Sequence, residues 1–109
     1  MSISGYIPPE LTVDQLRALV RDALENAPGW GNIETFHARY HHLDRGITLD
    51  DVIHGLEQPW VLERKPEFNK HEWQWKYRLA TETVDGEPIV IVIGVDTVNS
   101  TFHVVTRWK

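Results

Sequence analysis

The chain has 109 residues, of which 41% are hydrophobic and 25% charged, and its formal net charge is −5. These values predict one soluble globular domain spanning 1–109, and the acidic balance argues against a general nucleic-acid-binding protein, with no DNA partner expected. The absence of cysteine excludes disulfides and cysteine-ligated metals. No apolar run approaches the ~20 residues needed to cross a bilayer, so we expect a cytoplasmic protein without a membrane partner.

Helical periodicity predicts three helices in the first half of the chain. The first covers 12–26, where a capping-box spacing precedes an apolar stripe. The second is expected over 34–45, before a glycine that ends it. The third covers 48–57, with Thr48 as its cap and Asp51 three residues further on.

From Trp60 onward the hydrophobic period changes from 3.6 to 2, which predicts a meander of four antiparallel strands. The apolar run "PIVIVIGV" is expected to be the central strand, and Asp85-Gly86 before it predicts a two-residue hairpin turn. The segment "LERKPEFNKHEW" is expected to be a mobile loop. The predicted fold class is therefore α+β, with three N-terminal helices packed on one face of a four-stranded antiparallel meander sheet.

Strand alternation predicts a basic surface on the face of the sheet away from the helices. Lys76 and Arg78 alternate with large aromatic residues in one strand, and His103 and Arg107 alternate with Phe102 in the last strand. If the aromatic faces meet the helices, the four basic side chains gather on the open face. For any one of these residues, an ordinary solvated sheet face is the simpler interpretation.

The segment "FHARYHH" concentrates histidines on the predicted second helix. Glu34, His37 and His41 are spaced as i, i+3 and i+7, which could hold a divalent ion. No fourth ligand is evident, and histidine pairs are common on solvated helices, so we expect no metal and no cofactor. His37 borders the apolar stripe, where it could act as an acid or base or bond locally within the helix.

Several short motifs lie in the same order as in a known group of bacterial proteins. They are His37-Ala38, "RGIT" at 45–48, Val52, Leu56 and "VVT" at 104–106. With these motifs, residues 33–107 resemble a family of domains of unknown function placed beside the BrnT and RelE-type toxins. That broad group of small metal-independent ribonucleases also includes barnase. The resemblance implies a RelE/BrnT-like core over 33–109 and an extra N-terminal helix within 1–32.

The resemblance implies an endoribonuclease of toxin type, or a protein derived from one, with RNA as the substrate and an antitoxin or another protein as partner. Such chemistry needs a titrating group and cations around the phosphate. The expected catalytic residues are His37, Arg78 and Arg107, and the expected RNA-binding residues are Lys76, His103 and Arg45. The alternative is a non-catalytic protein-binding module, an immunity or regulatory partner, which the acidic charge and five tryptophans favour. The two interpretations leave open whether the chain is an enzyme.

Overall fold

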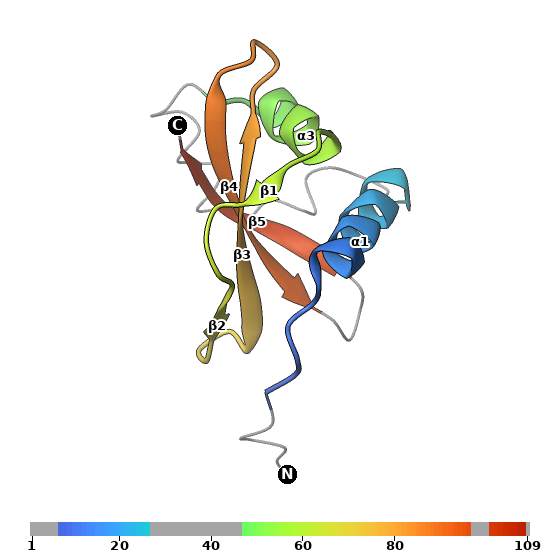
Figure 1. The fold of residues 1–109 in the computed structure, drawn as a ribbon, viewed down its shortest axis with the longest axis vertical. Coiled ribbons are helices and arrows are strands. Elements are labelled where there is room, and N and C mark those ends of the chain that lie inside the picture. The colour runs from blue at the N-terminus through green and yellow to red at the C-terminus, as the bar shows by residue number, and fades with distance from the viewer. Residues whose placement is uncertain (1–6, 27–46, 97–100, 109) are drawn as a thin grey trace.

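The computed structural model of the chain describes residues 7–26, 47–96 and 101–108 (Figure 1). Within them, α1 (Val13–Asn26) and α3 (Leu49–Glu57) lie on one face of a five-stranded antiparallel sheet. This arrangement confirms the α+β class and the antiparallel pairing, while the predicted count of four strands is wrong. The strands are β1 (Val61–Leu62), β2 (Glu67–Asn69), β3 (Gln74–Glu82), β4 (Pro88–Asp96) and β5 (Thr101–Trp108).

Both described helices begin with a predicted capping box. The Thr12 N–H donates to Gln15 Oε1 at 2.9 Å, and the Gln15 N–H donates to Thr12 Oγ1 at 3.2 Å. In α3 the Thr48 N–H donates to Asp51 Oδ2 at 3.0 Å, and the Asp51 N–H donates to Thr48 Oγ1 at 3.2 Å. These bonds satisfy backbone N–H groups that have no partner within the helix. The predicted second helix, over 34–45, lies outside the described residues.

The unpredicted strand is β2, which lies within the segment expected to be a mobile loop. Asn69 closes a tight turn there, because its Oδ1 accepts hydrogen bonds from the N–H groups of His71 at 2.9 Å and Glu72 at 3.0 Å. The turn reverses the chain, so that β2 and β3 pair antiparallel. Phe68 of β2 packs edge-on against Trp75 of β3, with ring centroids 5.4 Å apart. The loop prediction is therefore wrong for these residues. Because β1 pairs further along the same edge of β3, the two short strands together occupy the place of one.

The hairpin between β3 and β4 forms where it was predicted, but its loop has three residues instead of two. The Thr83 N–H donates to the Glu87 carbonyl at 2.8 Å, and the Gly86 N–H donates to the Thr83 carbonyl at 2.9 Å. Gly86 has a φ of 86°, the left-handed conformation that ends a three-residue hairpin loop. Asp85-Gly86 therefore predicted the position of the hairpin correctly, and the left-handed conformation of Gly86 gives the loop three residues.

The helices and one face of the sheet enclose a single apolar core. Gly55 allows α3 to approach the sheet closely, because a Cβ at this position would lie 2.8 Å from Thr81 Cγ2 and 3.1 Å from Ile91 Cδ1. The Thr81 hydroxyl donates to the Gly55 carbonyl at 2.7 Å and holds the two elements together. The core residues are Leu16, Val20, Ile47, Val52, Leu56, Trp60, Tyr77, Leu79, Ile89, Ile91, Ile93, Val95, Phe102 and Val104.

A β-bulge in β5 changes which side chains share a face. Val92 pairs with Thr106, but the next residue of β4, Ile93, pairs with Val104, so that Val105 is the extra residue. Arg107 consequently pairs with Ile91 on the core face, where its exposed fraction is 0%. His103 pairs with Gly94 on the opposite face. The prediction that Arg107 and His103 share a face is therefore wrong, because simple alternation does not anticipate the additional residue.

We predict that Gly55→Ala lowers the free energy of unfolding by about 1–3 kcal/mol, because the added methyl group has no space between α3 and the sheet. Urea denaturation would measure the change. The control is Gly86→Asn, which replaces a left-handed glycine by a residue that tolerates this conformation. A Gly55→Ala protein as stable as wild type would show that α3 is not held at this distance from the sheet.

Candidate active site on the sheet

The candidate site lies on the face of the sheet opposite α1 and α3, which no described helix covers and which we call the distal face. The strand register places Lys76 of β3, Gly94 of β4 and His103 of β5 side by side on this face. Arg78 lies two residues along β3 from Lys76 and is directed to the same face. The structure therefore brings together three of the four basic residues predicted to gather there.

Gly94 provides the space in which the site forms. A Cβ on this residue would lie 2.6 Å from Gln74 Oε1, 2.7 Å from His103 Cε1 and 2.9 Å from His103 Nε2. The amide and the imidazole thus lie over the backbone of β4, where a side chain would otherwise stand. Gln74 Oε1 is buried and accepts no hydrogen bond from any described residue. A buried acceptor without a donor is costly, so a donor supplied by a ligand would be favourable here.

An ion pair forms the second part of the site. Lys76 Nζ lies 2.6 Å from Glu72 Oε1, at the end of the turn that Asn69 closes. The hydrogen bond from Lys76 lowers the pKa of Glu72, so this residue is a carboxylate at neutral pH. The Lys76 side chain is only 17% exposed, so its ammonium group is held close to the strand. We call Glu72, Gln74, Lys76 and His103 the distal cluster.

Burial lowers the pKa of His103 below its ordinary value of 6.5. The positive charge of Lys76 acts in the same direction, while the Glu72 carboxylate opposes it. His103 is consequently a neutral imidazole at pH 7, with a ring nitrogen able to accept a proton. A neutral histidine beside an ammonium group combines a base with a cation.

A family model described as a domain of unknown function, DUF4258, matches residues 35–107. The chain belongs to the DUF4258 family. The match assigns no activity, and nothing in it links the chain to the BrnT or RelE toxins. No significant match was found among curated proteins or among solved structures. No helix in the described parts of the chain is long and apolar enough to span a membrane.

The DUF4258 match contains all of the distal cluster, but α1 lies outside it. Of the other predicted site residues, His37 and Arg45 lie outside the described residues, as do Glu34 and His41 of the metal interpretation. Among residues that the structure describes, no group of three His, Asp or Glu side chains is placed to hold a metal ion.

Sequence reasoning missed Glu72 as a member of the site and did not anticipate the burial of Arg107. Glu72 stands in a segment interpreted as a loop, and its partner Lys76 is four residues away along a turn and strand rather than along a helix. Asn69 followed by polar residues and then by an alternating strand was the available hairpin signal. For Arg107, the pattern of the last strand was regular and carried no sign of a bulge.

We predict that acidification from about pH 8 to pH 5 lowers the free energy of unfolding more for wild type than for His103→Gln. The His103 pKa is below 6.5 in the folded chain, so the unfolded chain binds this proton more readily. The contribution is fully present above about pH 6.5 and is lost as the pH falls below that value. Urea denaturation at several pH values measures the difference. His71→Gln, at an exposed position, is the control, and equal pH dependence of wild type and His103→Gln would contradict the prediction.

Proposed function

We propose that the protein is a metal-independent endoribonuclease whose active site is the distal cluster. The observation that carries this proposal is the neutral, half-buried His103 beside the ion pair of Lys76 and Glu72. RNA cleavage without a metal requires a base near the 2′-hydroxyl group and cations where phosphate charge develops. The distal cluster contains both kinds of group within one strand register.

In the proposed reaction, His103 accepts the proton of the 2′-hydroxyl group as its oxygen forms a bond to phosphorus. The bond between phosphorus and the 5′-oxygen breaks, and the Lys76 ammonium supplies a proton to the leaving oxygen. Transfer of the proton from His103 to Lys76 then restores both groups. The products are a 2′,3′-cyclic phosphate and a 5′-hydroxyl end. Glu72 positions Lys76, because its carboxylate accepts the hydrogen bond that holds the ammonium group in place.

Arg78 is the proposed phosphate-binding residue, since a guanidinium group can contact two oxygens at once. It lies on the distal face beside Lys76 in the same strand. Arg107, which was predicted as a catalytic residue, is not part of the proposed site because it is buried on the core face. His37 as an acid or base and Arg45 as an RNA contact stay predictions.

We predict that wild type cleaves single-stranded RNA in excess EDTA and leaves 2′,3′-cyclic phosphate ends. His103→Ala should lower the cleavage rate by a factor on the order of 100 or more, because the base is removed. Lys76→Met should have an effect of similar size, because it removes both the cation and the proton donor. Rates are measured on end-labelled RNA at matched concentrations of folded protein.

His54→Ala is the matched control for the loss of a histidine, because α3 covers the other face of the sheet. Its rate should equal that of wild type when both proteins are purified in parallel, which also reports any contaminating ribonuclease. The proposal fails if wild type cleaves none of several RNAs, or if His103→Ala retains the wild-type rate.

A non-catalytic protein-binding module is the second proposal. The specific observation in its favour is the mixed charge of the distal face. Glu72 is paired with Lys76, and Glu67 lies directly across from Lys76 in the register of β2 and β3. Such a surface suits a protein partner as well as a phosphate chain, and the acidic chain as a whole repels RNA. An antitoxin or other protein partner and a cytoplasmic location remain proposals.

A further inference from the structure

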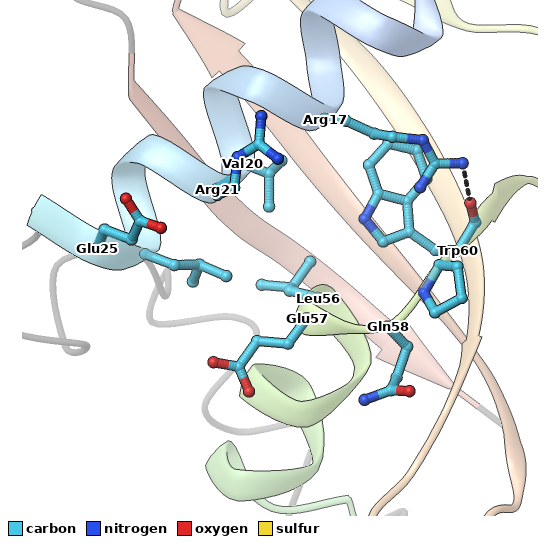
Figure 2. Close-up of a pocket in the computed structure, with 10 residues that line it drawn as sticks. Arg17, Val20, Arg21, Glu25, Leu56, Glu57, Gln58 and Trp60 are labelled. Atoms are coloured by element: carbon cyan, nitrogen blue, oxygen red, sulfur yellow. Dashed lines mark hydrogen bonds between the residues drawn. The ribbon is translucent and has the colours of Figure 1, made fainter.

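A groove of about 440 Å³ lies between α1, the end of α3 and Trp60, remote from the distal face (Figure 2). Its volume is within the range of ligand-binding cavities. The inner part is apolar, with Val20 and Leu24 from α1 and Leu56 from α3. Because α1 lies outside residues 35–107, one wall of the groove is not part of the family match.

Arg17 forms the fixed end of the groove. Its Nη2 donates to the Trp60 carbonyl at 2.8 Å, and its guanidinium lies 4.5 Å from the centre of the Trp60 ring. The hydrogen bond and the cation–π contact hold this side chain against the protein, as Figure 2 shows. Trp60 itself is buried and serves as the rigid wall.

Two exposed carboxylates, Glu25 and Glu57, occupy the end of the groove away from Trp60 (Figure 2). Glu25 lies in the last turn of α1, which contains no basic residue, and Glu57 is the last residue of α3. A negative charge is unfavourable there, because the helix macrodipole is negative at the C-terminal end. Arg21 also lines the groove, one helical turn before Glu25, but neither carboxylate forms an ion pair with it or with any other described residue. Both helix ends would therefore be stabilised by a cation from outside.

We propose that this groove docks a basic amphipathic segment of a partner protein. An apolar side chain of the partner fills the inner part of the groove, and a lysine or arginine binds between Glu25 and Glu57. The charge of the chain favours this occupant, since the formal net charge is −5. The distance from Arg17 to Glu25 along α1 is about 12 Å, which corresponds to roughly four residues of an extended peptide.

The test uses two capped tetrapeptides that each have two central leucines, one flanked by lysines and one by glutamates. Binding is followed by NMR through the indole N–H of Trp60 and the methyl groups of Leu24 and Leu56. The lysine peptide should shift these signals saturably, and the glutamate peptide should not. Glu25→Gln combined with Glu57→Gln should weaken binding of the lysine peptide by about 3- to 30-fold, because two exposed ion pairs are lost.

Glu63→Gln combined with Glu82→Gln is the matched control, because it changes the net charge equally at exposed positions outside the groove. This control should retain binding, and the groove variant should retain the RNA cleavage rate of wild type. The proposal is overturned if the lysine peptide does not bind, if the glutamate peptide binds equally well, or if both double variants weaken binding alike. These outcomes are independent of whether the distal cluster cleaves RNA.

Discussion

The additional residue in β5 is the constraint on which both faces of the sheet depend. Side chains alternate along a strand, so Val105 moves every later residue to the opposite face. Arg107, which follows the bulge, is thereby directed to the core face beside Ile91, while His103, which precedes it, lies on the distal face. Burying a guanidinium is costly unless its polar groups have partners, and Arg107 interacts within the structure while its Nε and Nη2 have no hydrogen-bond partner among the described residues. The bulge thus separates a structural cation from a titrating histidine only four residues away.

Two glycines, one at each face of the sheet, leave space that a side chain would otherwise fill. Gly55 lets α3 contact β3 and β4 closely enough to seal the core. Gly94 leaves space on the distal face, and the imidazole of His103 lies in that space beside Gln74. Partial burial in this position keeps the imidazole neutral, whereas a fully exposed histidine would titrate near its ordinary value. Stability therefore comes from one face and the proposed chemistry from the other.

The parts of the fold that follow from local chemistry could be predicted from the sequence. The spacing of Thr48 and Asp51 predicted the start of a helix, and Gly86 predicted a hairpin. The bulge could not be predicted, because "TFHVVTRW" alternates plausibly in either register and only pairing with β4 selects one. The position of Lys76, Arg78 and His103 on the distal face was predicted from strand alternation. The distal cluster as a whole was not. Its carboxylate and the space above β4 depend on the turn at Asn69 and on the neighbouring strand, which are properties of the folded chain.

The most direct test of the account is the pKa of His103 measured by NMR with and without a 2′-deoxy dinucleotide, which cannot undergo the cleavage reaction. In the free protein the pKa should lie below 6.5, because the imidazole is partly buried. When the dinucleotide binds, the negative phosphate should stabilise the imidazolium and raise this pKa. A pKa of His103 that does not respond to saturating dinucleotide would contradict a phosphate site at the distal cluster.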